Sequence, residues 1–286
     1  MTVDHANSAR DLAKLAQQVP SLPLTFQRIN DLVSNPQSTT AQMAEAISTD
    51  QGLITRILRL SNSSFYGLAA RVDTITQAVA LIGTRQLRDL ALATAVLDLF
   101  KNIPNQVLDG RKFWEHSLAV GTATRLIAAK RGERQTERHF VAGMLHDIGL
   151  VVMAQQMPEK FSANVQSAAS SAQPLSVIEL RELGFDHAEL GGMVIEHWRL
   201  PPAMTEVAAY HHHLLTTTKY VHDCATVHLA DIMVEALAFG SGGEPVIPPL
   251  DPPAWEILGL TPGDLAPICN DLERQMVEIT AIFLPQ

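Results

Sequence analysis

Within the stretch 142–149, His146 and Asp147 stand side by side at the end of an apolar helical run. Imidazole and carboxylate are both ligands that divalent metal ions accept. Neighbouring side chains on a helix point about 100° apart, so the two can face one point only from a helix end or a kink. Gly149 predicts such an end, because glycine tolerates the left-handed conformation that stops helices. Taken alone, the pair also fits an ordinary hydrogen-bonded pair in a protein core.

More imidazoles and carboxylates fall on the apolar faces of predicted helices. Asp231 lies on the apolar stripe of the segment 221–239, so we expect it to face the interior, where a lone carboxylate is costly. The complete set comprises His116, His146, Asp147, His187, His211, His212 and Asp231. Each residue by itself is more often structural, but together they form the mixture that hard-to-borderline divalent ions accept.

The elements that would position these residues are helical. Apolar residues recur at helical spacing almost throughout the chain, which predicts an all-α protein. Several short helices joined by tight turns predict a helical module at the N-terminus. Within it, Thr74 and Gln77 have the spacing of a capping box, in which each side chain satisfies an amide of the first helical turn. A stretch with Asn, Pro and Gly at 101–110 and a stretch rich in Gly, Ser and Pro at 240–253 predict linkers.

The composition and the net charge limit which partners and which cellular compartment we expect. The formal net charge of -9 argues against nucleic acid as the main partner, since phosphate binding favours a basic surface. Arg85, Arg88 and Asp89 form either a partner surface or, as we favour, a solvated helix face. No apolar run is long enough to cross a bilayer, and the N-terminus lacks the pattern of a signal peptide. With only two cysteines, the reducing cytoplasm is the expected location.

Several stretches, occurring in the right order, carry a resemblance to a known family. They are residues 58–67, 75–92, 114–117, 143–149, 187–191 and 198–201. From about Val19 to about Glu235, the chain resembles the HDOD (HD-related output domain) family, a branch of the HD superfamily of metal-dependent phosphohydrolases. The resemblance implies a multi-helical, HD-domain-like bundle preceded by an N-terminal helical module.

The resemblance also implies how the chain is divided. We expect residues 1–105 to form the N-terminal helical module of the HDOD unit and residues 106–240 to form the HD-like helical domain. Residues 241–286 are expected to form a Pro/Gly-rich linker and a C-terminal helix that packs on the body.

Two adjoining metal positions are implied as well. The first set comprises His116, His146, Asp147 and Asp231, and the second comprises His187, His211 and His212. The pair within 211–213 could shift by one residue. In the superfamily the ions bridge a hydroxide and bind a phosphate, so one or two ions of the Fe, Mn, Zn or Ni class are expected.

The chain departs from the related cyclic-dinucleotide phosphodiesterases at three points. Those enzymes have lysine where this chain has Leu150, and a glutamate where it has Lys112. After the histidine pair they carry a Glu and an Asp-Gly-x-Gly-Tyr-Pro element, which residues 213–220 do not match. Each lost donor to a transition state costs about 2.7–4 kcal/mol in comparable sites. We therefore expect metal binding with weak or absent hydrolysis.

Two functions follow from the resemblance and these departures. The favoured one is a bacterial signal-transduction output or regulatory domain that acts through a signalling protein partner or a small nucleotide ligand. The alternative is a metal-dependent phosphohydrolase or phosphodiesterase that acts on a nucleotide or cyclic dinucleotide. In that case Lys112, Lys219 or Arg181 would have to steady the phosphate. The sequence leaves the oligomeric state open.

Overall fold

The computed structural model describes residues 5–103, 107–214 and 219–284. Within these ranges every regular element is a helix, as the periodicity predicted, and no strand is present. None of the described helices is both long and apolar enough to cross a membrane.

Six helices make up the first part of the chain. They are α1(His5–Gln17), α2(Leu24–Ser34), α3(Thr40–Ser48), α4(Gln51–Ser61), α5(Ile75–Ile82) and α6(Thr84–Leu99). Side chains close in the sequence cap the ends of several of these short helices. The predicted capping box of α5 is confirmed: the Gln77 amide donates to Thr74 Oγ1 and the Thr74 amide donates to Gln77 Oε1, each at 3.2 Å. Gly83, with φ of 101°, ends α5 and allows the chain to start α6 at once.

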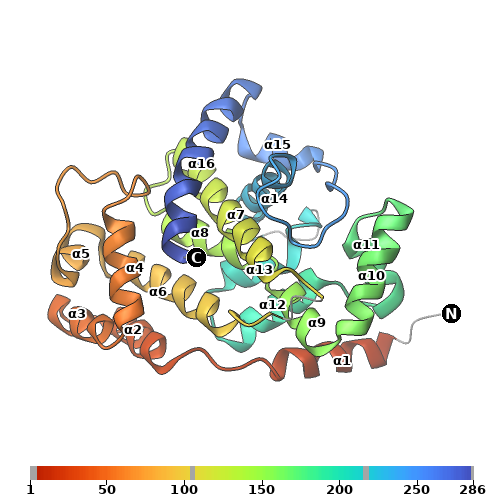
Figure 1. Ribbon diagram of the computed structural model, residues 1–286, viewed down its shortest axis with the longest axis horizontal. Helices are drawn as coiled ribbons and strands as arrows, with labels where there is room; N and C mark the ends of the chain where they lie inside the picture. Colours follow the sequence, from red (N-terminus) through yellow and green to blue (C-terminus); the bar gives the residue numbers. More distant parts are fainter. Residues whose placement is uncertain (1–4, 104–106, 215–218, 285–286) are drawn as a thin grey trace.

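The second part of the chain is built around the long helix α7 (Figure 1). Its helices are α7(Gly110–Lys130), α8(Glu137–Leu145), α9(Ile148–Gln156), α10(Pro158–Ser171), α11(Leu175–Leu183), α12(His187–His197), α13(Pro202–Tyr210) and α14(Val221–Ala236). Helix α7 packs against α8 and α14, and α12 packs against α9 and α13. Two further helices, α15(Pro252–Leu258) and α16(Pro262–Phe283), follow.

The two parts share one hydrophobic core that extends from Leu15 to Phe283. Helix α6 packs on α8, and α16 contacts both α7 and α4. Helix α1 lies against α9 and α12, away from the other helices of the first part (Figure 1). Helix α1 therefore packs on the second part, and the chain then passes to the first part, where it forms α2–α6.

The prediction that Gly149 ends the helix before it is wrong. Helix α8 already ends at Leu145, and Gly149 is the second residue of α9, without a positive φ. The helix end is instead the turn that contains His146 and Asp147. Gly149 allows close packing, because a Cβ at this position would lie 2.0 Å from the carbonyl oxygen of His187 on α12. The glycine is thus required by the contact between α9 and α12.

Candidate metal centre

The structure brings all seven predicted ligand residues together. Helix α7 carries His116, the turn between α8 and α9 carries the His146–Asp147 pair, and α12 begins at His187. The pair 211–212 directly follows α13, and Asp231 lies on α14. All of these side chains are buried except that of His212, which is half-buried.

The residues form two adjoining groups. One contains His116, His146 and Asp231, and the other contains Asp147, His187, His211 and His212; within each group the ligand atoms lie within 4.8 Å of one another.

Asp147 faces both groups. Its Oδ2 lies 3.1 Å from Nε2 of His146, while its Oδ1 lies 3.3 Å from Nε2 of His187 and 3.3 Å from Nε2 of His211. One carboxylate is therefore placed to bridge two cation positions.

Backbone carbonyls orient two of the imidazoles. His146 Nδ1 donates to the carbonyl oxygen of Gly143 at 2.7 Å, and His211 Nδ1 donates to that of Ala208 at 2.9 Å. Because a carbonyl can only accept, the proton sits on Nδ1 and Nε2 is turned toward the centre. This arrangement is the usual way in which a protein fixes the tautomer and direction of a metal-binding histidine.

Several buried polar atoms in the centre lack hydrogen-bond partners. They include Nε2 of His116, His146 and His211 and Oδ1 of Asp147. The imidazole nitrogens and carboxylate oxygens approach one another, but not with hydrogen-bonding geometry. Buried polar groups without partners are costly and rare. A divalent cation in each group would satisfy these atoms together, so the residues present fit a metal centre.

The electrostatics of the centre favour positive charge. Burial lowers the pKa of His146, but Asp147 and Asp231 outweigh it and raise that pKa to about 10. Burial likewise raises the pKa of Asp147, but the neighbouring imidazoles outweigh it and hold that pKa well below its usual range. Burial also raises the pKa of Asp231, but His116 and His146 outweigh it and hold that pKa well below its usual range. The two carboxylates therefore stay ionised, and their charge is balanced either by an imidazolium or by a bound metal ion.

Comparison with known proteins shows the family to which the chain belongs. The HDOD domain family matches residues 19–214, more than half of the 286 residues. The chain belongs to the HDOD family. A solved HDOD domain protein of unknown function from Geobacter sulfurreducens is 25% identical, with a TM-score of 0.79, and the match covers 96% of this chain and 99% of that one.

Other relatives are more distant or longer. A protein from Shewanella amazonensis with the provisional description of phosphohydrolase is 23% identical, with a TM-score of 0.75 over 95% of this chain and 97% of that one. This likeness shows the fold alone. An uncharacterised protein from Treponema pallidum is 25% identical over 207 residues, which are 72% of this chain and 40% of that protein. The HDOD chain thus spans less than half the length of this curated relative.

Two acidic residues at the centre were not predicted from the sequence. Glu179 of α11 is fully buried, and its Oε2 accepts from the backbone amide of His187 at 2.9 Å and from Nδ1 of the same histidine at 2.6 Å. Glu235 Oε1 lies 3.5 Å from Nδ1 of His116. Glu235 follows Asp231 by one helical turn, a spacing that could have revealed it. No pattern in the sequence points from Glu179 to His187.

The three cations considered for holding a phosphate lie outside the centre of the HDOD chain. Lys112, Lys219 and Arg181 all have exposed side chains. Arg181 Nε is paired with Glu182 at 2.9 Å. Within the histidine run, the pair in the centre is 211–212, while Nε2 of His213 lies 3.5 Å from Asp186. Residues 215–218 of the departing segment lie outside the described residues.

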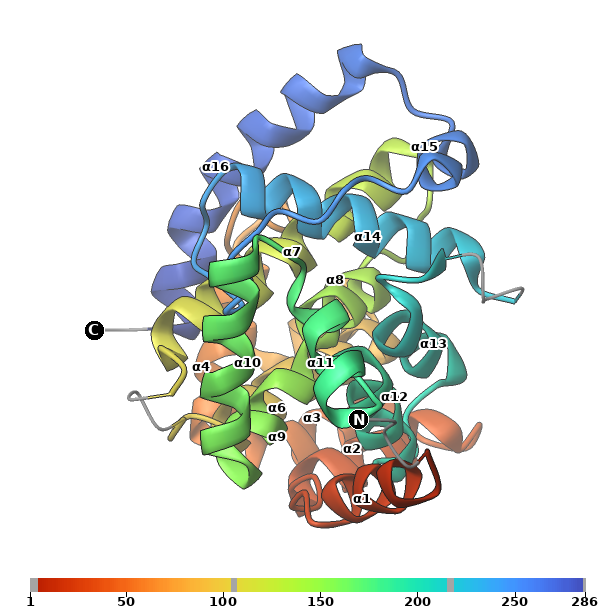
Figure 2. The same ribbon diagram turned by 90° about the vertical axis from the view of Figure 1, so that its right-hand side faces the viewer.

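Residues 240–244, which we call the strap, cover the centre. Figure 2 shows the chain after α14 folding back toward α7 and α10 before it reaches α15. The Ser241 amide donates to the carbonyl oxygen of Lys112 at 3.1 Å. A Cβ at Gly242 would lie 2.9 Å from Asp147 Oδ2 and 3.6 Å from His116 Nε2. The strap, which the sequence predicted only as part of a linker, therefore lies in close contact with the candidate ligands. Glycine permits this close approach because it has no Cβ.

Replacing Gly242 by alanine should loosen the strap. The new methyl group would crowd the carboxylate of Asp147, and the backbone must move outward to relieve the contact. Amide hydrogen exchange should become faster at Ser241 and Gly243, whose amides are both hydrogen-bonded in the structure. Gly263→Ala is the matched control, because its Cβ would meet only Thr261 Oγ1 at 3.7 Å. Equal exchange in the two variants would contradict the proposed crowding.

Glu244 should make stability depend on pH. Its carboxylate accepts from the Leu175 amide at 3.0 Å, and burial raises its pKa from 4.5 to about 8. As the pH rises between these two values, the unfolded chain releases the proton while the folded chain keeps it, so the free energy of unfolding falls. Glu244→Gln does not titrate. Its melting temperature should exceed that of the wild type by a margin that grows from about pH 4.5 to about pH 8 and then levels off. A margin independent of pH would show that Glu244 has an ordinary pKa.

Proposed function

We propose that this HDOD protein is a regulatory domain of bacterial signal transduction that holds divalent metal and has little or no hydrolase activity. The observation that supports the proposal is the strap: Gly242 lies against Asp147 and His116, so this part of the centre is covered by the chain itself. Both residues are buried, with exposed fractions of 6% and 1%. Seven candidate ligands are thus combined with a covered site.

The residues of the two groups would hold the metal. His116, His146 and Asp231 would bind one ion, and His187, His211 and His212 a second, with Asp147 between them. A bound ion supplies positive charge and Lewis acidity. In this covered centre its main effect is on the fold. The ligand residues tie α7, the α8–α9 turn, α12, the end of α13 and α14 to one another, and an ion that binds only the folded state stabilises that state.

One observation favours the alternative, a metal-dependent phosphohydrolase or phosphodiesterase. A carboxylate that faces two histidine groups, as Asp147 does, is suited to a two-metal centre that activates water. Such a reaction also requires a cation or donor that stabilises the phosphate in the transition state. Lys112, Lys219 and Arg181, the cations considered for that role, are all exposed. We therefore rank this function second.

Metal analysis followed by phosphodiesterase assays tests the proposal. Protein purified without a histidine tag should retain stoichiometric divalent metal at neutral pH. It should hydrolyse a generic phosphodiester and cyclic dinucleotides no faster than its His146→Ala variant does. Activity that is present in the wild type and lost in a folded His146→Ala protein would establish the phosphohydrolase instead. Absence of retained metal would refute the metal centre.

A further inference from the structure

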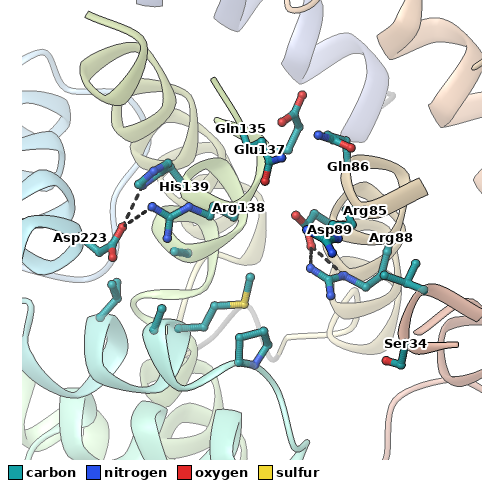
Figure 3. A pocket seen from close by; sticks show the side chains of 16 residues that line it. Ser34, Arg85, Gln86, Arg88, Asp89, Gln135, Glu137, Arg138, His139 and Asp223 are labelled. Atoms are coloured by element: carbon teal, nitrogen blue, oxygen red, sulfur yellow. Dashed lines mark hydrogen bonds and ion pairs between the residues drawn. The ribbon is translucent and has the colours of Figure 1, made fainter. Parts of the chain in front are cut away.

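A cavity of about 420 Å³ between the two parts of the molecule is lined by charged side chains from both (Figure 3). On one side, the Arg88 guanidinium donates to Asp89 Oδ1 at 2.6 Å, and on the other side Arg138 lies 3.3 Å from Asp223. The interpretation of Asp89 as part of a solvated face is wrong, since its side chain is buried where α6 packs against α8. These charges balance one another within the protein, so the cavity by itself does not indicate a ligand.

His228 is a buried histidine that lies beside the candidate metal centre without belonging to either group of ligands. It is on α14, three residues before Asp231, and is 3% exposed. Its Nδ1 donates to the carbonyl oxygen of His211 at 2.8 Å, and its Nε2 accepts from the backbone amide of Asp251 at 2.9 Å. Because a carbonyl can only accept and an amide can only donate, the two contacts require the neutral ring with its proton on Nδ1. Both ring nitrogens are thus engaged by the backbone.

The carbonyl that His228 holds belongs to the peptide between two candidate ligands. His211 and His212 are neighbours in the sequence, and both are members of the second group. A peptide unit is planar, so the direction of the His211 carbonyl determines how the chain leaves His211 and how it enters His212. His211 is also the C-cap of α13, where the last carbonyls of a helix have no partner within the helix. The bond from His228 therefore fixes the backbone of both ligands at once.

The two ligand side chains depend on this peptide to different degrees. The ring of His211 is held a second time, because its Nδ1 donates to the carbonyl oxygen of Ala208 at 2.9 Å. His212 instead contacts another candidate ligand, with 3.0 Å between its Nε2 and that of His187. A proton between these two nitrogens must leave before both can bind a metal ion. The direction of His212 in the loaded centre is thus set mainly from its backbone.

The other nitrogen of His228 connects this peptide to the segment that carries the strap. Asp251 is the N-cap of α15, and its side chain makes no capping hydrogen bond. Its amide reaches His228 at the far end of the segment 240–251, whose first residues form the strap over Asp147. One side chain thus joins the end of this segment to the ligand pair.

We propose that His228 is a positioning residue of the metal centre, whose Nδ1–H holds the peptide between His211 and His212 in the direction that lets the second group bind a divalent ion. The inference rests on the proposed function, because it requires that the centre holds metal.

Three substitutions at His228 separate this role from the filling of space. His228→Phe keeps a ring of similar size and removes both hydrogen bonds. His228→Asn can place an N–H donor near the position of Nδ1, whereas His228→Gln, one carbon longer, can place an acceptor near that of Nε2. Of the three, only His228→Asn therefore keeps the contact with the His211 carbonyl.

Titration of the full chain with Co²⁺, followed by visible absorption, is the measurement. His228→Phe and His228→Gln should weaken one bound ion by about 10–100-fold, the loss typical of residues that orient a metal ligand, and should shift the absorption bands of that ion. His228→Asn should bind Co²⁺ almost as the wild type does. Asp251→Ala is the control, because it keeps the backbone amide and should leave affinity and spectrum unchanged.

The opposite results would overturn the positioning role. One is an equal affinity and spectrum in the wild type and His228→Phe. Another is a loss in His228→Asn as large as that in His228→Phe, since the ring would then matter only for packing. If His228→Phe does not fold, His228→Gln and His228→Asn decide, and equal binding by these two contradicts the proposal. A wild type that binds no Co²⁺ refutes the proposed function as well, whereas a wild type that binds it as tightly as His228→Phe refutes the positioning role alone.

Discussion

Replacing Asp147 by alanine should remove metal from both groups at once. Its two carboxylate oxygens face different histidines: Oδ2 lies 3.1 Å from His146, and Oδ1 lies 3.3 Å from His187 and from His211. The variant should retain no stoichiometric metal. Its free energy of unfolding should also fall by about 3–5 kcal/mol, because removal of the Asp147 carboxylate leaves buried imidazoles without their counter-charge.

The Asp231→Ala variant is the control. It separates the loss of a carboxylate that faces both groups from the loss of a buried carboxylate that faces only one. Asp231 contacts only the first group, with Oδ1 at 3.2 Å from His116 Nε2 and 3.6 Å from His146 Nε2. Its alanine variant should therefore lose metal from the first group and keep the second. Metal analysis and urea unfolding of both variants provide the measurements. An Asp147→Ala protein that retained as much metal as Asp231→Ala would show that the carboxylate does not bridge the groups.

Gly149→Ala should be among the most destabilising small substitutions in the chain. The added methyl carbon would lie 2.0 Å from the carbonyl oxygen of His187 and 2.9 Å from the amide nitrogen of Gly191. Both are backbone atoms of α12, so no side chain can rotate away. Helices α9 and α12 must separate, which costs about 3 kcal/mol or more, although alanine itself favours a helix by about 1 kcal/mol over glycine.

Denaturant unfolding measures this effect, with Gly263→Ala as the control. At Gly263 the new Cβ would lie in ordinary contact, 3.7 Å from Thr261 Oγ1, so the midpoint should hardly move. The separation of α9 and α12 also displaces His187, so Gly149→Ala should retain less metal than the control does. Equal midpoints in the two variants would mean that the contact between the helices is looser than the structure shows.

The local chemistry of the sequence predicted much of the fold correctly. Helical spacing predicted an all-α chain, and the Thr74–Gln77 pair predicted the start of α5, because caps are formed by residues a few positions apart. The apolar stripe of α14 placed Asp231 in the interior, where the structure has it, with an exposed fraction of 6%. Family resemblance added the order of the candidate ligands, and the family itself is shown by the match to residues 19–214.

The same reasoning failed where distant segments touch. Gly149 was interpreted as a helix stop, but its neighbour is His187 on another helix, a contact that no local pattern reveals. Glu179 was missed for the same reason, since only the packing of α11 beside the start of α12 brings its carboxylate to His187.

The sequence by itself therefore determined the helical class, the types of ligand and the inward direction of the buried acids, since these depend on residues a few positions apart. Only the tertiary structure decided that the seven groups meet, that Asp147 faces both sets, and that Gly242 covers them. Distances of this kind depend on how helices far apart in the chain cross and pack, and a periodic pattern carries no information about the crossing. The same holds for the cavity between α6 and α8, whose charged residues come from two separate segments.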